Sequence, residues 1–307
     1  MAIQKQIDKL KKDKNAIILA HYYQNPEIQD IADFVGDSLD LSRKSANNKA
    51  DIIVFAGVNF MAETAKILSP EKKVLIPDTE AGCSLAESCP AKEFRKFRNK
   101  FPDHTVVSYV NTTAEIKAMT DICCTSTNAV KIIQSIPKEQ KIIFAPDRNL
   151  GNYLSSITGR DMVIWDGACH VHEEFSLERI TEIKKEHPEA KLIAHPECKR
   201  PVLIAADFIG STSALLNYTK NDNGNKYIVA TEPGILHQMI KSKPDKTFIP
   251  APPIDSTCGC SNCEYMKLLT LEKIYTSLKE EKYEIKVEPG IRDKALSPIM
   301  RMLEASE

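Results

Sequence analysis

Polar residues recur at matching positions in three stretches of the chain, residues 20–38, 108–126 and 194–212. The stretches begin 88 and 86 residues apart and align without a gap. Three aligned columns carry side chains that bind anions or move protons: His21, Tyr109 and His195; Tyr23, Asn111 and Glu197; and Ser38, Ser126 and Thr212. Imidazole, phenol and carboxylate groups are common proton carriers in enzymes. The columns therefore predict acid–base chemistry on a small anionic substrate.

The hydroxyl column precedes a helix in every copy, where we expect the hydroxyl to cap free backbone N–H groups. A helix N-terminus with a hydroxyl beside it also binds phosphate or carboxylate. A fourth column falls inside or at the end of a helix, and we expect its carboxylates to accept hydrogen bonds from the following turn: Asp33, Asp121 and Asp207.

Cysteine follows the last expected strand of every copy. Cys83 stands in the first copy, Cys169 in the second, and the third offers Cys258, Cys260 and Cys263. One thiolate from each copy makes three, one fewer than the four that saturate a cubane iron–sulfur cluster. The iron left open would bind a substrate oxygen as a Lewis acid. Symmetry does not choose among the three candidates of the third copy.

The chain has nine cysteines, and the other four are interpreted as structural: Cys89, Cys123, Cys124 and Cys198. His170 and His172 either line the cavity or form an exposed loop pair. Arg148 is expected at the same edge of its sheet, and Glu232 at the matching place in the third copy, supporting the site from behind.

Alternating strands and helices must position these residues. Each copy has a charged helix and then an unalternating apolar run, at 15–20, 104–110 and 190–195, as is typical of strands buried in a parallel sheet. Two further strands follow, separated by helices. This order predicts an α/β protein of three homologous αβα sandwich domains with short parallel sheets around a pseudo-threefold axis. Ligands bind at the carboxyl ends of such strands, so the active site is expected at the central junction.

The predicted domains are residues 1–85, 86–172 and 173–264. Helices within 265–307 are expected to pack on the first domain, the last of them beginning after Ser297 and Pro298.

Composition narrows the function class. The net charge is −1 with acids and bases interspersed, which gives no footprint for nucleic acid or for a membrane surface. No apolar run approaches the roughly 20 residues that span a bilayer. The first 15 residues contain no apolar signal core, and we expect a cytoplasmic protein. No glycine-rich nucleotide-binding motif occurs at a strand–helix junction.

Several motifs together resemble the quinolinate synthase family, the iron–sulfur enzymes of de novo NAD biosynthesis. The resemblance covers essentially the whole chain and rests on ILAHYYQNPEIQDIADFVGDSL, VSYVNTTAE, TSTNAV, FAPDRNLG, AHPEC, GST and the pattern CxxMKxxTLE that begins at Cys263. The resemblance implies three αβα domains about a pseudo-threefold axis. It also implies a transferase that condenses iminosuccinate with dihydroxyacetone phosphate to give quinolinate, phosphate and water.

The resemblance further implies one [4Fe-4S] cluster per chain, held by Cys83, Cys169 and Cys263, with one open iron. Tyr23 and Glu197 are implied as proton carriers. The implied substrate-binding set is His21, Ser38, Tyr109, Asn111, Ser126, His195, Glu197 and Thr212. The implied partners are small molecules, with a functional link to an L-aspartate oxidase or dehydrogenase that supplies iminosuccinate. An auxiliary dithiol is one interpretation of Cys258 and Cys260.

Two alternative functions are also considered. One is another [4Fe-4S] hydro-lyase of small hydroxy acids. The other is a non-enzymatic metal or redox sensor that uses the CGCSNC segment, residues 258–263, because only this segment has the short cysteine spacing of a zinc site.

Overall fold

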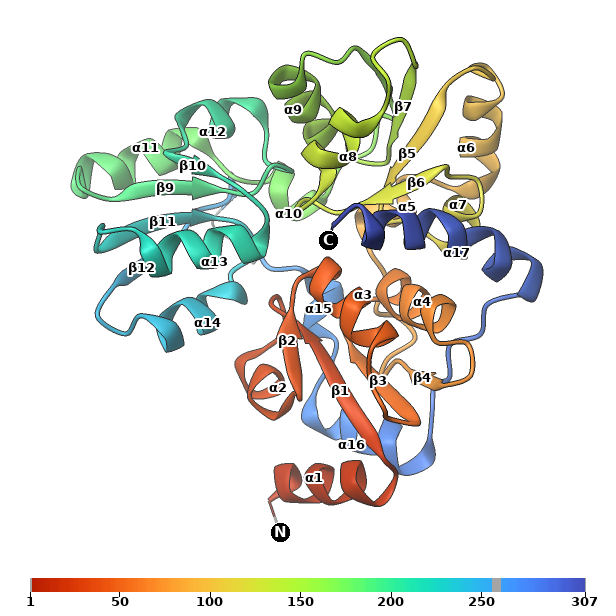
Figure 1. The fold of residues 1–307 in the computed structure, drawn as a ribbon. Helices are drawn as coiled ribbons and strands as arrows, with labels where there is room; N and C mark the ends of the chain where they lie inside the picture. Colours follow the sequence, from red (N-terminus) through yellow and green to blue (C-terminus); the bar gives the residue numbers. More distant parts are fainter. Residues whose placement is uncertain (1, 256–260, 307) are drawn as a thin grey trace.

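Three four-stranded sheets form the framework of the protein. A computed structural model describes residues 2–255 and 261–306. All pairings between neighbouring strands are parallel, and helices flank each sheet. Figure 1 shows the three sheets with their helices grouped around a common centre. The predicted α/β class with three αβα sandwiches and parallel sheets is confirmed.

The same order of elements occurs three times, and we call each occurrence a unit. The first unit contains α1 (Ile3–Asp13), β1 (Ala16–His21), α2 (Pro26–Ile31), β2 (Phe34–Gly36), α3 (Ser38–Ala46), β3 (Ile52–Ala56), α4 (Asn59–Leu68), β4 (Lys73–Leu75) and α5 (Ser84–Glu87). The second contains α6 (Ala91–Arg98), β5 (Thr105–Tyr109), α7 (Ala114–Lys117), β6 (Ile122–Cys124), α8 (Ala129–Ser135), β7 (Ile142–Ala145), α9 (Arg148–Thr158), β8 (Met162–Ile164) and α10 (His170–Glu173). The third contains α11 (Leu177–Glu186), β9 (Lys191–Ala194), α12 (Arg200–Ala205), β10 (Phe208–Ile209), α13 (Thr212–Asn221), β11 (Lys226–Ala230), α14 (Ile235–Ser242), β12 (Thr247–Pro250) and α15 (Glu264–Lys267).

The strand order is the same in every sheet: β2-β1-β3-β4, β6-β5-β7-β8 and β10-β9-β11-β12. The short edge strands β2, β6 and β10 replace the turn that was expected before the hydroxyl column. With only two or three residues each, they give no periodic pattern that sequence can reveal. They bring the hydroxyl column to the same sheet edge as the other two columns.

The aspartates directly precede the edge strands and bond to the first strand of each unit, so the expected bond to the following turn was wrong. Asp121 Oδ2 accepts from the N–H of Val106 at 2.8 Å, while its own N–H donates to the Val106 carbonyl at 3.0 Å. Asp33 with Ile18 and Asp207 with Leu192 repeat both bonds. Each aspartate thereby fastens an edge strand to the first strand of its unit.

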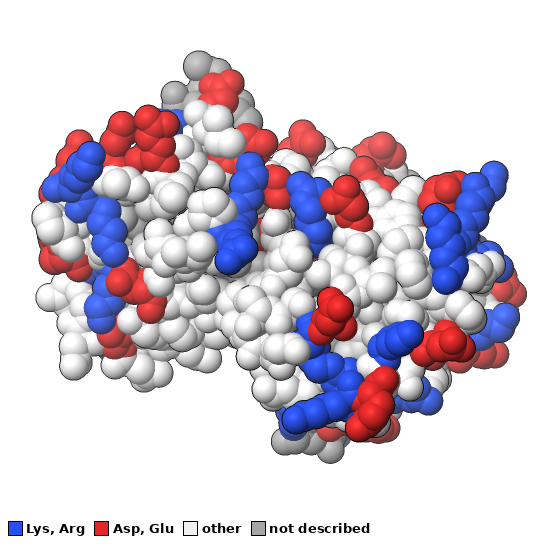
Figure 2. Space-filling view, turned by 90° about the horizontal axis from the view of Figure 1, so that it is seen from above, with Lys and Arg blue, Asp and Glu red and all other residues white. Residues whose placement is uncertain are grey.

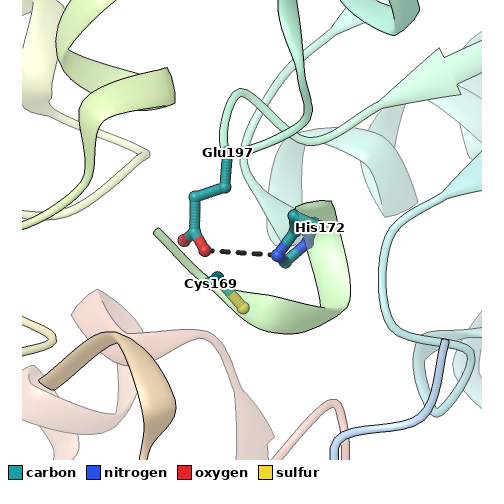
Figure 3. Close-up of side chains that lie close together, drawn as sticks. All are labelled: Cys169, His172 and Glu197. Atoms are coloured by element: carbon teal, nitrogen blue, oxygen red, sulfur yellow. Dashed lines mark ion pairs between the residues drawn. The ribbon is translucent and has the colours of Figure 1, made fainter. Parts of the chain in front are cut away.

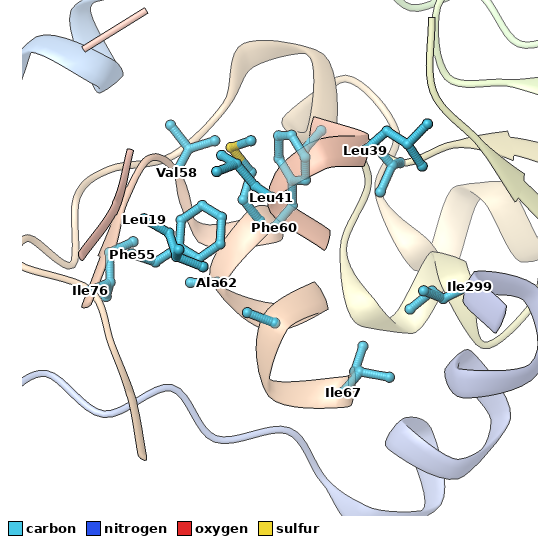
Figure 4. Packing of buried hydrophobic residues seen from close by; sticks show 14 of the residues in the cluster. Leu19, Leu39, Leu41, Phe55, Val58, Phe60, Ala62, Ile67, Ile76 and Ile299 are labelled. Atoms are coloured by element: carbon cyan, nitrogen blue, oxygen red, sulfur yellow. The ribbon is translucent and has the colours of Figure 1, made fainter. Parts of the chain in front are cut away.

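The central strands are buried because helices cover both faces of each sheet. All five residues of β3 are buried. Figure 4 shows Leu19, Phe55 and Phe60 in the largest apolar cluster, which also contains Ile299 from the C-terminal end of the chain.

Two further helices follow the third unit, α16 (Leu271–Glu280) and α17 (Pro289–Glu304). α16 packs on α1, while α17 packs on α4 of the first unit and on α7 and β6 of the second (Figure 1). The prediction that the last helix begins after Pro298 was wrong. Glu288 caps the helix by accepting from the N–H groups of Gly290 and Ile291, and Pro298 lies inside it.

Charged side chains are mixed over the surface. On the face drawn in Figure 2, acidic and basic groups alternate, and neither sign forms a continuous field. Within the described residues, no helix is long and apolar enough to cross a bilayer.

Candidate active site

One cavity of about 60 Å³ lies where the carboxyl ends of the strands of all three units meet. All nine residues of the three columns line it, and so do three cysteines, one from each unit: Cys83, Cys169 and Cys263. The sequence repeats thus correspond to a single shared cavity.

Two histidines face the cavity as neutral hydrogen-bond donors. His21 Nδ1 accepts from the N–H of Tyr23 at 3.2 Å, and His195 Nδ1 accepts from the N–H of Glu197 at 3.3 Å. An Nδ1 that accepts leaves the ring proton on Nε2. Burial lowers the pKa of His21 to about 4 and that of His195 to about 3. Both rings therefore stay neutral near pH 7 with the proton on Nε2, which in His195 lies 3.2 Å from the Ser126 hydroxyl.

Glu197 is a buried carboxylate at the centre of a hydrogen-bonded group. The hydroxyl of Tyr109 donates to Oε1 at 2.6 Å, and His172 Nδ1 lies 3.2 Å from Oε2 (Figure 3). Burial works against ionisation of Glu197, but the neighbouring His172 and the Tyr109 hydrogen bond outweigh it, and the pKa falls to about 2. Glu197 is thus ionised near pH 7.

Thr231 connects the two predicted proton carriers. Its hydroxyl lies 2.7 Å from the Tyr23 hydroxyl and 3.0 Å from His172 Nε2. Together with the contact between His172 and Glu197, this makes a continuous series of exchangeable protons from Tyr23 to Glu197. Burial raises the pKa of Tyr23 well above its ordinary value, so Tyr23 holds its proton.

Sequence reasoning missed Thr231 and left His172 undecided. His172 is 2% exposed and lines the cavity, which removes the exposed-loop alternative for it. The position of Thr231, directly after β11 (Lys226–Ala230), is the signal that was overlooked.

The expected capping role of the hydroxyl column was wrong. Asp37 caps α3 by accepting from Leu39 N–H and Asp40 N–H, each at 3.0 Å, and Ser211 caps α13. Ser38 and Thr212 are the first residues of these helices, and Ser126 lies three positions before α8. Because other residues cap α3 and α13, the hydroxyls of Ser38 and Thr212 do not serve as caps, and that of Thr212 lies 3.0 Å from the Tyr23 hydroxyl.

The three cavity cysteines occupy equivalent positions. Each is the N-cap of a four-residue helix: Cys83 of α5, Cys169 of α10 and Cys263 of α15. The sulfur atoms of these three N-cap residues accept no capping hydrogen bond from their helices. Burial raises the pKa of Cys83 to about 12 and that of Cys263 to about 11, so binding a metal must displace their protons. Cys258 and Cys260 lie outside the described residues.

Three other sequence candidates have partners of their own. Glu232 lines the cavity and pairs with Lys267 at 2.9 Å. Arg148 is absent from the described cavity lining and pairs with Glu173 at 3.1 Å. His170 Nδ1 lies 2.7 Å from the Ser84 hydroxyl. The four cysteines interpreted as structural are all buried: Cys89, Cys123, Cys124 and Cys198.

Comparison with known proteins gives one family. The family model described as "Quinolinate synthetase A protein" matches residues 5–304. The quinolinate synthase of Trichormus variabilis is 62% identical over 300 residues, which cover 98% of this chain and 92% of the relative. The quinolinate synthases of Thermosynechococcus vestitus and Microcystis aeruginosa are 59% and 60% identical, each over 98% of this chain and 94% of the relative.

Proposed function

The chain belongs to the quinolinate synthetase A protein family and is an enzyme of that family, and we propose that it makes quinolinate from iminosuccinate and dihydroxyacetone phosphate. Forming the pyridine ring requires a carbon–carbon bond, a carbon–nitrogen bond and the loss of phosphate and water. Each step moves protons between carbon, nitrogen and oxygen. The observation that carries the proposal is one cavity that combines proton carriers, neutral anion-binding donors and three thiols.

Neutral donors suit the two anionic substrates. No lysine or arginine occurs among the described residues that line the cavity. Carboxylates and phosphate would instead be bound by the Nε2–H groups of His21 and His195 and by the hydroxyl column, Ser38, Ser126 and Thr212. Asn111 Oδ1 is a buried atom without a hydrogen-bond partner, which supports a role in binding a ligand N–H or hydroxyl group.

Glu197 and Tyr23 are proposed to move the protons. Glu197 would accept a proton from carbon or nitrogen during tautomerisation, while its hydrogen bond to Tyr109 keeps its orientation. Tyr23 would donate a proton to a leaving oxygen and recover it through Thr231 and His172. Residues in such roles contribute factors of about 10²–10⁴ to the rate.

The donor set fits a [4Fe-4S] cluster held by Cys83, Cys169 and Cys263. All three are free thiols on the same cavity, and each stands directly before a four-residue helix in its unit. When bound through three thiolates, such a cluster supplies one open iron that acts as a Lewis acid toward a substrate oxygen. We also propose three domains, residues 1–85, 86–172 and 173–264, whose borders lie at the short helices that follow the cysteines, α5, α10 and α15.

Free thiols and an unstable imine substrate indicate where the enzyme works. All seven described cysteines are free, which suits a reducing cytoplasm. Iminosuccinate hydrolyses readily, so an enzyme that oxidises L-aspartate, an oxidase or a dehydrogenase, is the proposed source of this substrate.

Metal analysis and turnover test the proposal together. Protein purified without oxygen should be brown, contain about four iron and four sulfide per chain, and bleach in air. With iminosuccinate present it should consume dihydroxyacetone phosphate and release quinolinate. One zinc without sulfide would contradict the proposal, and turnover of a hydroxy acid without dihydroxyacetone phosphate would favour a hydro-lyase.

Glu197→Gln separates chemistry from cluster binding. We expect the variant to keep the cluster absorbance and to lose turnover by at least about 10². Loss of the cluster in this variant would instead make Glu197 a structural residue.

A further inference from the structure

Cys169, His172 and Glu197 form a second group of metal-binding donors inside the cavity. The Cys169 sulfur, a ring nitrogen of His172 and a carboxylate oxygen of Glu197 all lie within 4.8 Å of one another. Figure 3 shows the three side chains converging from α10 and from the loop after β9. The group shares one residue with the proposed cluster ligands and otherwise uses different chemistry, one sulfur, one nitrogen and one oxygen.

The His172 ring has an unsatisfied nitrogen directed at this group. Nδ1 is buried and has no hydrogen-bond partner, although Glu197 Oε2 is only 3.2 Å away. When Nε2–H donates to Thr231, 3.0 Å away, Nδ1 keeps its lone pair. In this tautomer the lone pair faces the carboxylate 3.2 Å away, and a divalent cation between them would bind both groups. A hydrogen bond from the remote ring nitrogen is also the usual way in which proteins orient metal-binding histidines.

We propose that the chain, when it holds no cluster, binds one Zn²⁺ or a similar divalent metal through Cys169, His172 and Glu197. Sulfur, imidazole and carboxylate are the ligand types that zinc takes, and three protein ligands leave a fourth position for water. The thiolate and the carboxylate balance the two charges of the ion. Zinc–ligand bonds of about 2.0–2.3 Å place tetrahedral ligands roughly 3.5 Å apart, so the donors need to close by about 1 Å.

The two metal centres exclude each other because both use Cys169. Zinc at this site would also occupy Glu197 and His172, the residues proposed to handle protons. The cluster-free chain would therefore be inactive and would resist cluster assembly until the zinc is removed. This inference rests on the donor geometry and does not depend on which substrates the enzyme uses.

Cobalt(II) is the probe, because it takes zinc sites and reports thiolate ligands by absorbance. Full-length cluster-free protein is titrated with Co²⁺ without oxygen. We expect one ion per chain, a charge-transfer band from a single thiolate, and displacement by one equivalent of Zn²⁺. Cys169→Ser should abolish the band, and His172→Gln and Glu197→Gln should each weaken binding at least tenfold.

Cys83→Ser and Cys263→Ser are the matched controls. Each removes a cavity thiol that belongs to the proposed cluster set but not to the zinc group, so both variants should keep the band and the affinity. Equal loss in these controls would show that the three cluster thiolates bind the ion and would overturn the proposal, as would the absence of binding. Circular dichroism checks that every variant is folded. If Cys169→Ser does not fold, His172→Gln and Glu197→Gln, which keep all thiols, test the proposed zinc ligands instead.

Assembly of the cluster provides a second measurement. Protein preloaded with one equivalent of Zn²⁺ should acquire the brown absorbance from iron and sulfide at least tenfold more slowly than metal-free protein. In His172→Gln that delay should disappear. An equal delay in this variant would contradict the proposed ligands.

Discussion

The backbone sets the protonation of the cavity histidines. In two units the N–H group two residues after the histidine donates to Nδ1, so His21 and His195 are fixed as the same tautomer. Protonation would place a charge in a buried site and would break that bond. The histidines therefore act as hydrogen-bond donors, and proton transfer is left to Glu197, His172 and Tyr23.

Acid should destabilise the folded protein through His21, to which His195 adds an effect of the same sign. The pKa of His21 is about 4 in the folded chain because burial disfavours the charged ring, against about 6.5 when unfolded. Between these values the unfolded chain binds the extra proton. The histidine thus contributes stability that is complete above pH 6.5 and is lost as the pH falls toward 4, at about 1 kcal/mol per pH unit.

Urea unfolding of cluster-free protein at several pH values measures this effect. We expect His21→Gln to reduce the slope of unfolding free energy against pH in that window. Ser38→Ala, which alters the same cavity without a titrating group, should keep the slope. An unchanged slope in His21→Gln would show that the ring is not the group responsible.

Tyr23→Phe tests the proposed proton path. The change removes the hydroxyl between Thr212, at 3.0 Å, and Thr231, at 2.7 Å. We expect kcat to fall by about 10²–10⁴, with a small change in KM, because the ring remains in place. Steady-state kinetics decides the matter, and a loss confined to KM would make Tyr23 a binding residue.

Residue types and spacing predicted which side chains would meet, since a parallel sheet brings equivalent strand ends to one edge. They did not reveal Thr231, because a single threonine after a strand is common. They also misplaced the caps of α3 and α13 by one residue, because Asp37 and Ser211 are equally good caps and only the backbone decides between neighbours.

Among the elements, the short edge strands depend on their aspartates. Val106 is buried, and its backbone N–H donates to the side-chain carboxylate of Asp121. We expect Asp121→Ala to lower the unfolding free energy by about 1–3 kcal/mol, the cost of leaving a buried N–H group unpaired.

Asp121→Asn is the matched control because an amide oxygen can still accept this bond. Chemical denaturation should show a smaller loss for it than for Asp121→Ala. Equal losses would mean that the negative charge, and not the hydrogen bond, stabilises the strand. Sequence alone could not assign this role. The two bonded residues lie 15 positions apart, and β6, the strand that follows Asp121, has only three residues.

In the whole molecule, contacts between units converge on the cavity. The Thr127 hydroxyl of the second unit bonds to Asp37 of the first and to Ser211 of the third, both at 2.9 Å. α17 covers the border between the first two units with Ala295, Ile299 and Met302, all fully buried. The repeats predicted three units around one centre, but such contacts involve residues that differ between copies, so duplication gives no sign of them.

Lys267 and Glu232 join the first and third units beside the cysteine of α15. Lys267 Nζ bonds to the Tyr23 carbonyl at 2.6 Å and to Glu232 at 2.9 Å. Glu232 is fully buried and accepts from the N–H groups of Gly234 and Cys263. Lys267→Met leaves this carboxylate without its cation, and we expect a loss of about 3–5 kcal/mol at pH 8.

The sign of the pH dependence distinguishes this loss from ordinary packing damage. Burial already raises the pKa of Glu232, with Lys267 opposing the rise. Without the lysine, the Glu232 carboxylate of the folded chain binds a proton at a higher pH than in the unfolded chain, where it is protonated only below about pH 4.5. The variant should therefore approach wild-type stability as the pH falls from 8 toward 4.5, and adding Glu232→Gln should restore part of the stability at pH 8. A deficit that stays constant with pH, and that Glu232→Gln does not reduce, would show that Lys267 acts by packing alone.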